Sequence, residues 1–148
     1  MNAGFLTGCL DLPLTEIVEF ASTVGFQALE LSAWPVVSSR DYSGSTIDIE
    51  RMDQKKAEEI SRLLQKHSIT ISSLAYYDNN LHHDLEVREG YLRHLHKVID
   101  VAHLLDVELV GTFVGRDQTK TIAANMDEFE KVFTPLLSYA ESKNVKIM

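Results

Sequence analysis

The stretch GFQALELSAWP, residues 25–35, carries the pattern that decides the fold. Gly25 follows an amphipathic segment, at a position where a helix commonly ends on a left-handed residue. Residues 27–31, in which Ala28, Leu29 and Leu31 are apolar, have the length of a buried strand, and the Ser, Ala, Trp and Pro around the strand end begin a loop. A helix end, a strand and a loop in this order predict one repeat of an α/β fold.

The same repeat recurs on both sides of this stretch. Strands are predicted at residues 4–10, 27–31, 69–75, 108–113 and 145–148, the last of them broken off. Helices are predicted between the strands, from apolar residues at three- and four-residue spacing. The first has Thr15 as its N-cap and buries apolar residues from Ile17 to Val24. The second and third bury residues from Ala57 to His67 and from Val87 to Leu105. The fourth is capped by Asn125, and Pro135 should kink or divide it.

Strands that alternate with helices predict parallel pairing, because a helical crossover returns the chain to the same edge of the sheet. An open doubly wound sheet and a closed (β/α)₈ barrel both satisfy this pattern. The first strand is followed by residues 11–14, Asp-Leu-Pro-Leu, and not by a glycine-rich phosphate turn, which argues against a dinucleotide-binding sheet. Periodicity alone leaves a flavodoxin-like sheet open.

Composition limits the classes of function. The chain has 148 residues, which fit a single domain, residues 1–148. The net charge of −8 argues against a nucleic-acid partner, because phosphate backbones are bound through surplus lysine and arginine. No apolar run reaches about 18 residues and no signal-peptide pattern begins the chain, so a cytoplasmic protein without a membrane span is expected.

Cys9 is the only cysteine in the sequence. An intramolecular disulfide and a zinc site built on several thiolates are therefore excluded. Because Cys9 lies in an apolar segment, we expect a buried small hydrophobic side chain and not a reactive thiol.

Four segments, taken in order, resemble the sugar phosphate isomerase/epimerase family, which has the xylose isomerase-like barrel. They are GFQALELSAWP (25–35), SLAYYDNNLHHD (73–84), VELVGTFVGRD (107–117) and FTPLLSYAESKNVKIM (133–148). One departure is His83, where family members often carry proline, and this would loosen the loop. The resemblance covers essentially the whole chain and implies an α/β fold that is a partial (β/α)₈ TIM barrel, its N-terminal half, with about four and a half βα units.

The same resemblance implies a divalent metal ion (Mn, Mg, Co or Zn) in the full-length parent. Family members hold it with acidic residues and a histidine near the ends of strands five to eight. The first such glutamate is expected shortly after Met148, so no metal ligand is expected in this chain. The catalytic residues stay unassigned, and the fragment alone is expected to be inactive.

In a barrel of this kind the active site lies at the carboxyl ends of the strands, so substrate-binding candidates are sought there. Trp34 follows the second strand and is either an apolar wall for a sugar face or a packed core residue. Tyr77, Asn80 and His82 follow the third strand and suit a pocket that hydrogen-bonds hydroxyl groups; the alternative is an exposed loop with Asp84 as a helix cap. We favour His82 facing the site, where a neutral imidazole can position a hydroxyl or carbonyl group.

Thr112 and Arg116 follow the fourth strand and complete the substrate-binding candidates. The planar fork of Arg116 suits a phosphate or carboxylate, and a surface arginine is the plain alternative. Glu30 lies inside an apolar strand, where a carboxylate needs a partner, and an internal ion pair is favoured over a place in the site.

These observations support three functions. The first is a metal-dependent isomerase or epimerase of a small sugar-like substrate, which moves a proton next to a carbonyl. The second is a dehydratase or lyase, because proton abstraction beside a carbonyl begins that reaction too. The third is a non-catalytic binding or association domain: a half barrel leaves two strand edges unpaired, and two copies could pair them in a homodimer.

Overall fold

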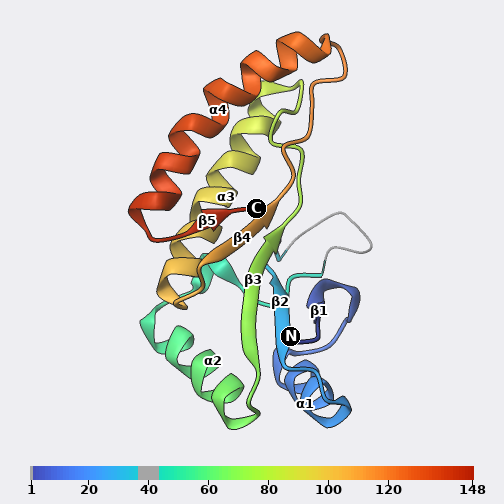
Figure 1. Cartoon of the computed structure of the whole chain (residues 1–148), viewed down its shortest axis with the longest axis vertical. Helices are drawn as coiled ribbons and strands as arrows, with labels where there is room; N and C mark the ends of the chain where they lie inside the picture. Colours follow the sequence, from blue (N-terminus) through green and yellow to red (C-terminus); the bar gives the residue numbers. More distant parts are fainter. Residues whose placement is uncertain (1, 37–43) are drawn as a thin grey trace.

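The computed structural model describes residues 2–36 and 44–148, in which five strands alternate with four α-helices (Figure 1). The strands are β1 (Gly4–Leu6), β2 (Ala28–Ser32), β3 (Thr70–Tyr76), β4 (Leu109–Thr112) and β5 (Lys146–Ile147). The helices are α1 (Leu14–Val24), α2 (Gln54–Lys66), α3 (Leu85–Leu104) and α4 (Ile122–Ser142). Two short 3₁₀ helices, η1 (Thr7–Cys9) and η2 (Ile49–Arg51), lie in the loops after β1 and β2.

The strands form one parallel sheet in the order β1-β2-β3-β4-β5, which is also their order along the chain. An open doubly wound sheet reverses its strand order at a switch point, and this sheet does not. The consecutive order therefore favours the arc of a barrel over the doubly wound alternative. The pairs Ser32–Ala75, Ala75–Gly111 and Tyr76–Thr112 bring the carboxyl ends of β2, β3 and β4 level.

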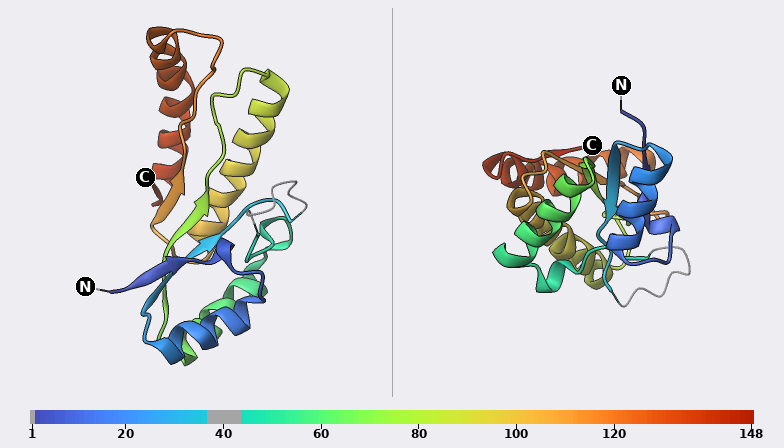
Figure 2. Two further views of the ribbon diagram at one scale, coloured as in Figure 1. Left: turned by 90° about the vertical axis from the view of Figure 1, so that its right-hand side faces the viewer. Right: turned by 90° about the horizontal axis from the view of Figure 1, so that it is seen from below.

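The outer face of the sheet carries the core. Leu31, Leu74 and Val110 lie level on β2, β3 and β4, and all three are fully buried. They pack beneath the helices, which follow one another along this side of the sheet (Figure 2). Burial of each such side chain stabilises the fold by roughly 1.5–3 kcal/mol. The helices contribute Ile17, Val18, Ala21, Ala57, Leu64, Leu95, Val98, Ile99, Ala102, Phe133, Leu136 and Ala140 to this core.

The opposite face, here called the inner face, carries mostly small and polar residues, although Leu6 of β1 pairs in register with Glu30. Glu30 pairs in register with Ser73, and Ser32, Ala75 and Gly111 form the next row toward the carboxyl ends. Because side chains alternate along a strand, these residues point away from the helices. In a closed barrel this face would line the interior.

Two helix starts differ from the sequence prediction. Pro13, not Thr15, is at the N-cap of α1, where the fixed φ of proline suits the turn into a helix. Thr121, not Asn125, caps α4, because its Oγ1 accepts the Ala124 N–H at 3.2 Å. The helix then continues over Pro135, so the predicted division at that proline is absent.

The start of the chain also differs from expectation. Strand β1 ends at Leu6, and the chain turns into η1, so the predicted strand over residues 4–10 is shortened. Cys9 therefore leaves the sheet and is exposed, which makes its predicted burial wrong. The physical reason lies in Thr7, whose side chain is buried and bonds Ser32 and Thr46 across the end of β2.

Candidate substrate-binding site at the strand ends

The carboxyl ends of β3 and β4 are joined by a hydrogen-bond network around Asn80. The Asn80 side chain is fully buried, and its Nδ2 donates to Thr112 Oγ1 at 3.0 Å and to the Phe113 carbonyl at 2.6 Å. Thr112 Oγ1 in turn donates to the Tyr76 carbonyl at 2.8 Å. The structure thus brings two of the predicted residues, Asn80 and Thr112, into direct contact, and it uses them to fix the loops that form the rim.

The Asn80 amide still has an unused acceptor. Its Oδ1 is buried and has no hydrogen-bond partner among the described residues. The neighbouring carbonyls hold the amide nitrogen, so a reversal of the amide would place an oxygen against oxygen. Trp34 Nε1 is a second buried polar atom at this end of the sheet for which the described residues offer no partner.

Three aromatic rings stand next to one another across the ends of β2, β3 and β4. The ring centroids of Trp34 and Tyr77 are 5.9 Å apart, and those of Tyr77 and Phe113 are 4.9 Å apart. Trp34 is only 7% exposed and contacts the core residue Tyr76, whereas Phe113 is 59% exposed. The accessible apolar wall at this rim is therefore offered by Phe113, which the sequence analysis did not single out.

A carboxylate and a phenol meet on the inner face. Tyr77 Oη donates to Glu30 Oε1 at 2.5 Å, and the ion pair expected for Glu30 is not found within the described residues. Burial, followed by the hydrogen bond and charge of Glu30, raises the pKa of Tyr77 above its ordinary value of 10.0. The phenol therefore stays protonated and remains a donor to the carboxylate.

The backbone of β4 makes room for this pair. A Cβ atom at Gly111 would collide with Tyr77 Oη and would lie 3.2 Å from Glu30 Oε1. Glycine at this position lets the two side chains lie directly over the strand.

His82 lies apart from the rim network, at the start of α3. Its Nδ1 accepts the Asp84 N–H at 3.1 Å, and its ring packs edge-on against Tyr91 at 6.1 Å. The Asp84 side chain caps α3 through the N–H groups of Glu86 and Val87. Nothing in this geometry brings His82 to Asn80 or Thr112, so a role in substrate binding stays a prediction.

Arg116 is exposed on the loop after β4 and lines a separate cavity of about 370 Å³. The walls of that cavity are mostly apolar and include Val114, Ile122, Met126 and Phe129. The backbone carbonyl of Arg116 accepts from Asn79 Nδ2 at 2.9 Å, which ties this loop to the loop after β3. The predicted phosphate or carboxylate clamp stays untested.

Buried polar residues hold the Arg116 loop to α3 and α4. Asn125 Oδ1 accepts the Asp117 N–H at 2.7 Å, and Asn125 Nδ2 donates to the Asp117 carbonyl at 3.0 Å. Hydrogen bonds from Thr119, with Lys120 nearby, lower the pKa of the Asp117 carboxyl. The buried Arg88 binds Glu128 at 2.8 Å, and this contact lowers the pKa of Glu128. These contacts tie the loop after β4 to α4, and α3 to α4.

His94 connects α3 to the loop that carries Trp34. Its Nε2 lies 2.7 Å from the Ala33 carbonyl oxygen, so the ring nitrogen must be the donor. The ring packs on Tyr76 at 4.5 Å. Burial lowers the pKa of His94 below its ordinary value of 6.5, which keeps the ring neutral. We regard His94 as a support for the Trp34 loop.

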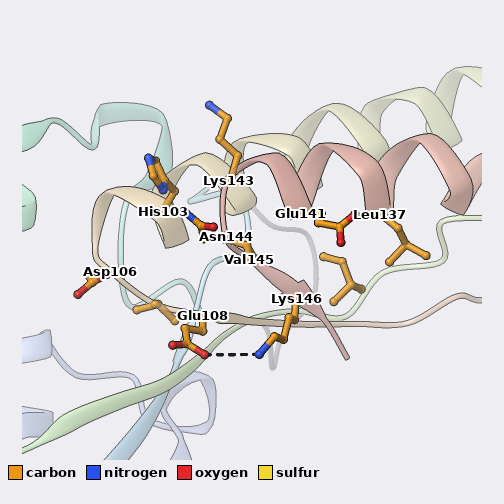
Figure 3. Close-up of a pocket in the computed structure, with 11 residues that line it drawn as sticks. His103, Asp106, Glu108, Leu137, Glu141, Lys143, Asn144, Val145 and Lys146 are labelled. Atoms are coloured by element: carbon orange, nitrogen blue, oxygen red, sulfur yellow. Dashed lines mark ion pairs between the residues drawn. The ribbon is translucent and has the colours of Figure 1, made fainter.

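A further cavity lies at the other end of the sheet. It measures about 720 Å³ and is lined by the amino ends of β4 and β5 and the end of α4. Figure 3 shows the ion pair of Glu108 and Lys146, 3.7 Å apart, beside this cavity. In barrels the amino ends of the strands serve stability, while ligands bind at the carboxyl ends. This cavity is therefore not the candidate substrate site.

Among residues 2–36 and 44–148, no group of three or more His, Cys, Asp or Glu side chains is placed to hold a metal ion. None of the described helices is both long and apolar enough to cross a lipid bilayer.

Comparison with known proteins identifies the scaffold. The family described as "Xylose isomerase-like TIM barrel" matches residues 18–148, whereas no curated protein matches the chain. Among solved structures, D-psicose 3-epimerase with D-tagatose from Clostridium cellulolyticum H10 is similar over 99% of this chain and 51% of its own, with a TM-score of 0.72 and 17% identity.

Two further solved structures are similar. The probable 3-DHS dehydratase AsbF from Bacillus anthracis has a TM-score of 0.67 and 16% identity over 100% of this chain and 51% of its own. The IOLI protein with a bound zinc atom has a TM-score of 0.70 and 17% identity over 99% of this chain and 50% of its own. The chain thus spans about half the length of these structures. At such identities the likeness establishes the fold, a partial barrel.

Proposed function

The chain belongs to the family of xylose isomerase-like TIM barrels, and on that premise we propose that it is the first half of a sugar or sugar phosphate isomerase or epimerase. Residues 1–148 would act as one domain of a cytoplasmic protein and would supply part of the substrate-binding rim. A small sugar-like molecule is the proposed partner, and the acidic net charge of −8 is the reason that nucleic acid is not.

The observation that carries this proposal is the rim at the ends of β2, β3 and β4. A sugar presents hydroxyl groups at its edges and a C–H face, and this rim offers both matching surfaces. The half-buried pair of Glu30 and Tyr77 supplies hydrogen-bonding groups, and Phe113 supplies an exposed ring face. Aromatic walls with a few placed polar groups are typical of small-molecule sites.

The reaction that we propose is proton transfer at a carbon next to a carbonyl group. The chain would bind and orient the substrate, while the general base is not assigned. A dehydratase or lyase reaction begins with the same proton abstraction, and the likeness to a probable dehydratase keeps it as a variant of the proposal.

A divalent metal ion is part of the proposal for the complete protein only. One similar structure is described with a bound zinc atom, but the described residues of this chain do not form a metal site. Metal ligands would have to come from outside these residues.

The test uses the complete protein that contains these residues. Interconversion of D-tagatose and D-fructose with their 3-epimers would be followed by chromatography, before and after treatment with a chelator. We expect turnover that is lost with the chelator and restored by Mn²⁺, Mg²⁺, Co²⁺ or Zn²⁺. Turnover that the chelator leaves unchanged would contradict metal dependence, and an absence of turnover would contradict the epimerase proposal for these substrates.

A second candidate function is a non-catalytic association domain. The sheet ends in two edge strands, β1 and β5, each with one unpaired side. Exposed apolar side chains lie beside both edges, with Phe20 and Val24 on α1 and Leu137 on α4. Two copies could cover these surfaces by pairing their edges. Analytical ultracentrifugation tests this candidate, because a single monomeric species at all concentrations would reject it.

A further inference from the structure

Glu30 occupies an unusual position for a carboxylate. It stands on the inner face of β2, in the middle of a strand whose outward residues Leu29 and Leu31 are fully buried. A half-buried carboxylate at such a place needs donors to offset its lost hydration. Tyr77 supplies one of them at 2.5 Å.

Only one oxygen of the Glu30 carboxylate has a hydrogen-bond donor among the described residues. A carboxylate has two oxygens and about four lone-pair sites, and the bond from Tyr77 reaches Oε1 alone. Within residues 2–36 and 44–148, no lysine, arginine or histidine forms an ion pair with Glu30, and no donor to Oε2 is found. Glu30 Oε2 can therefore receive a hydrogen bond from a molecule on the inner face.

The surroundings favour a small and neutral partner. Glu30 itself is half-buried, and the row beside it consists of the small residues Ser32, Ala75 and Gly111. Aromatic rings lie beside Glu30 toward the rim, with Tyr77 bonded to the carboxylate and packed on the exposed ring of Phe113 at 4.9 Å between ring centroids. A hydrogen-bond acceptor beside an apolar ring face matches a polyhydroxy compound, whose hydroxyl and C–H surfaces alternate.

We propose that Glu30, held in place by Tyr77, is a hydroxyl-binding subsite on the inner face, which accepts a hydrogen bond from a small polyhydroxy ligand. Tyr77 is a positioning residue, because its phenol orients the carboxylate, and Gly111 makes the arrangement possible. The inference rests on the proposed sugar-binding function and adds to it a residue that determines which hydroxyl pattern is bound.

The test measures binding and turnover separately in the complete protein. Isothermal titration with D-tagatose and with xylitol, which cannot undergo epimerisation at a carbonyl, is compared among wild type, Glu30→Gln and Tyr77→Phe. A hydrogen bond to a charged group contributes about 1.5–3 kcal/mol, so we expect Glu30→Gln to weaken binding by about 10- to 100-fold. Tyr77→Phe leaves the carboxylate in place but unoriented, and a smaller loss, of about 2- to 10-fold, is expected.

Two controls separate a local effect from unfolding. Glu58→Gln changes an exposed glutamate on α2 and should leave the affinity unchanged. Gly111→Ala keeps both functional side chains but pushes Tyr77 aside, and it should weaken binding to a similar extent as Tyr77→Phe. Circular dichroism spectra of all variants verify that each one is folded.

The outcomes distinguish the subsite from the proposed function. Wild-type turnover with equal affinity in Glu30→Gln overturns the subsite and leaves the isomerase proposal standing. Binding of xylitol or D-tagatose that Glu30→Gln weakens, without any turnover, supports the subsite and counts against the isomerase. A wild-type protein that binds neither compound overturns both.

Discussion

Single residues determine how the stability of this protein depends on pH. The pKa of Tyr77 is raised by burial and by Glu30, so the folded state holds this proton at a pH where the unfolded chain releases it. The contribution is fully present below about pH 10 and is lost as the pH rises through the folded-state pKa. We predict that the free energy of unfolding in urea falls more steeply above about pH 10 in wild type than in Tyr77→Phe.

The control for this measurement is Tyr91→Phe, which removes a half-buried phenol that packs against His82. It should retain the wild-type slope against pH. If Tyr77→Phe and wild type lose stability in parallel, the link between Tyr77 and Glu30 does not stabilise the folded state.

For His94 we predict a loss of stability at acid pH, in contrast to the loss at alkaline pH predicted for Tyr77. Its pKa is lowered by burial, so the unfolded chain takes up a proton first, and stability should fall as the pH drops below about 6.5. His94→Phe keeps a ring against Tyr76 but leaves the Ala33 carbonyl unpaired, which we expect to cost about 1–3 kcal/mol at neutral pH.

Urea unfolding at several pH values measures both effects of His94→Phe. The matched control is His103→Phe, because His103 is exposed on the same helix and should change stability by less than about 0.5 kcal/mol. Equal losses in the two variants would mean that the bond from His94 to Ala33 contributes nothing.

Residue types near the strand ends could be identified from the sequence, but their contacts could not. The pattern placed Asn80 and Thr112 after neighbouring strands, and parallel pairing brought them together. Glu30 was expected to form an ion pair, and it meets Tyr77, 47 positions away, instead. Pairing across such a distance depends on register, which shifts between Leu29 and Glu30, and local patterns carry no information about that shift.

At the scale of elements, the loop after β4 depends on one glycine. Gly115 has a φ of 71°, and a Cβ there would collide with Asn79. We predict that Gly115→Ala destabilises the protein by about 1–3 kcal/mol, because both the backbone conformation and the contact oppose a side chain. The measurement is the shift of the urea midpoint.

Gly90 offers the matched control for Gly115. It lies inside α3, where an added Cβ finds its nearest atom, Arg93 Nη2, at 3.9 Å. Gly90→Ala should therefore stabilise the protein by about 0.5–1 kcal/mol through a more favourable helix. Destabilisation by both substitutions to the same degree would show that φ at Gly115 is not the cause.

The alternation of helices and strands was predictable, and the helix ends were less so. Apolar spacing located all four helices, because burial of one face controls that pattern. A helix start depends instead on which oxygen reaches a free N–H group. Thr121 does so for α4, while Asn125 turns to the Asp117 backbone, although asparagine is on average the better N-cap of the two residue types.

For the whole molecule, the exposed surface along β5 predicts self-association of the 148-residue chain. Leu137 is 45% exposed and lines the cavity beside β5. If copies associate through this edge, Leu137→Lys should lower the sedimentation coefficient toward that of a monomer. Leu85→Lys, which alters a leucine 64% exposed at the start of α3, should not. An equal decrease of the sedimentation coefficient in both variants would indicate a general gain in solubility and no specific contact.

The sheet adds its strands in the same order in which a ribosome would produce them. Every strand after the first pairs with its immediate predecessor, so each new βα unit can dock as soon as it emerges, with no wait for a distant partner. Loops that join neighbouring units also close at a modest entropic cost. The protein can therefore acquire its structure progressively during translation, and at each stage a chaperone would need to shield the newest strand edge in addition to the constant edge of β1.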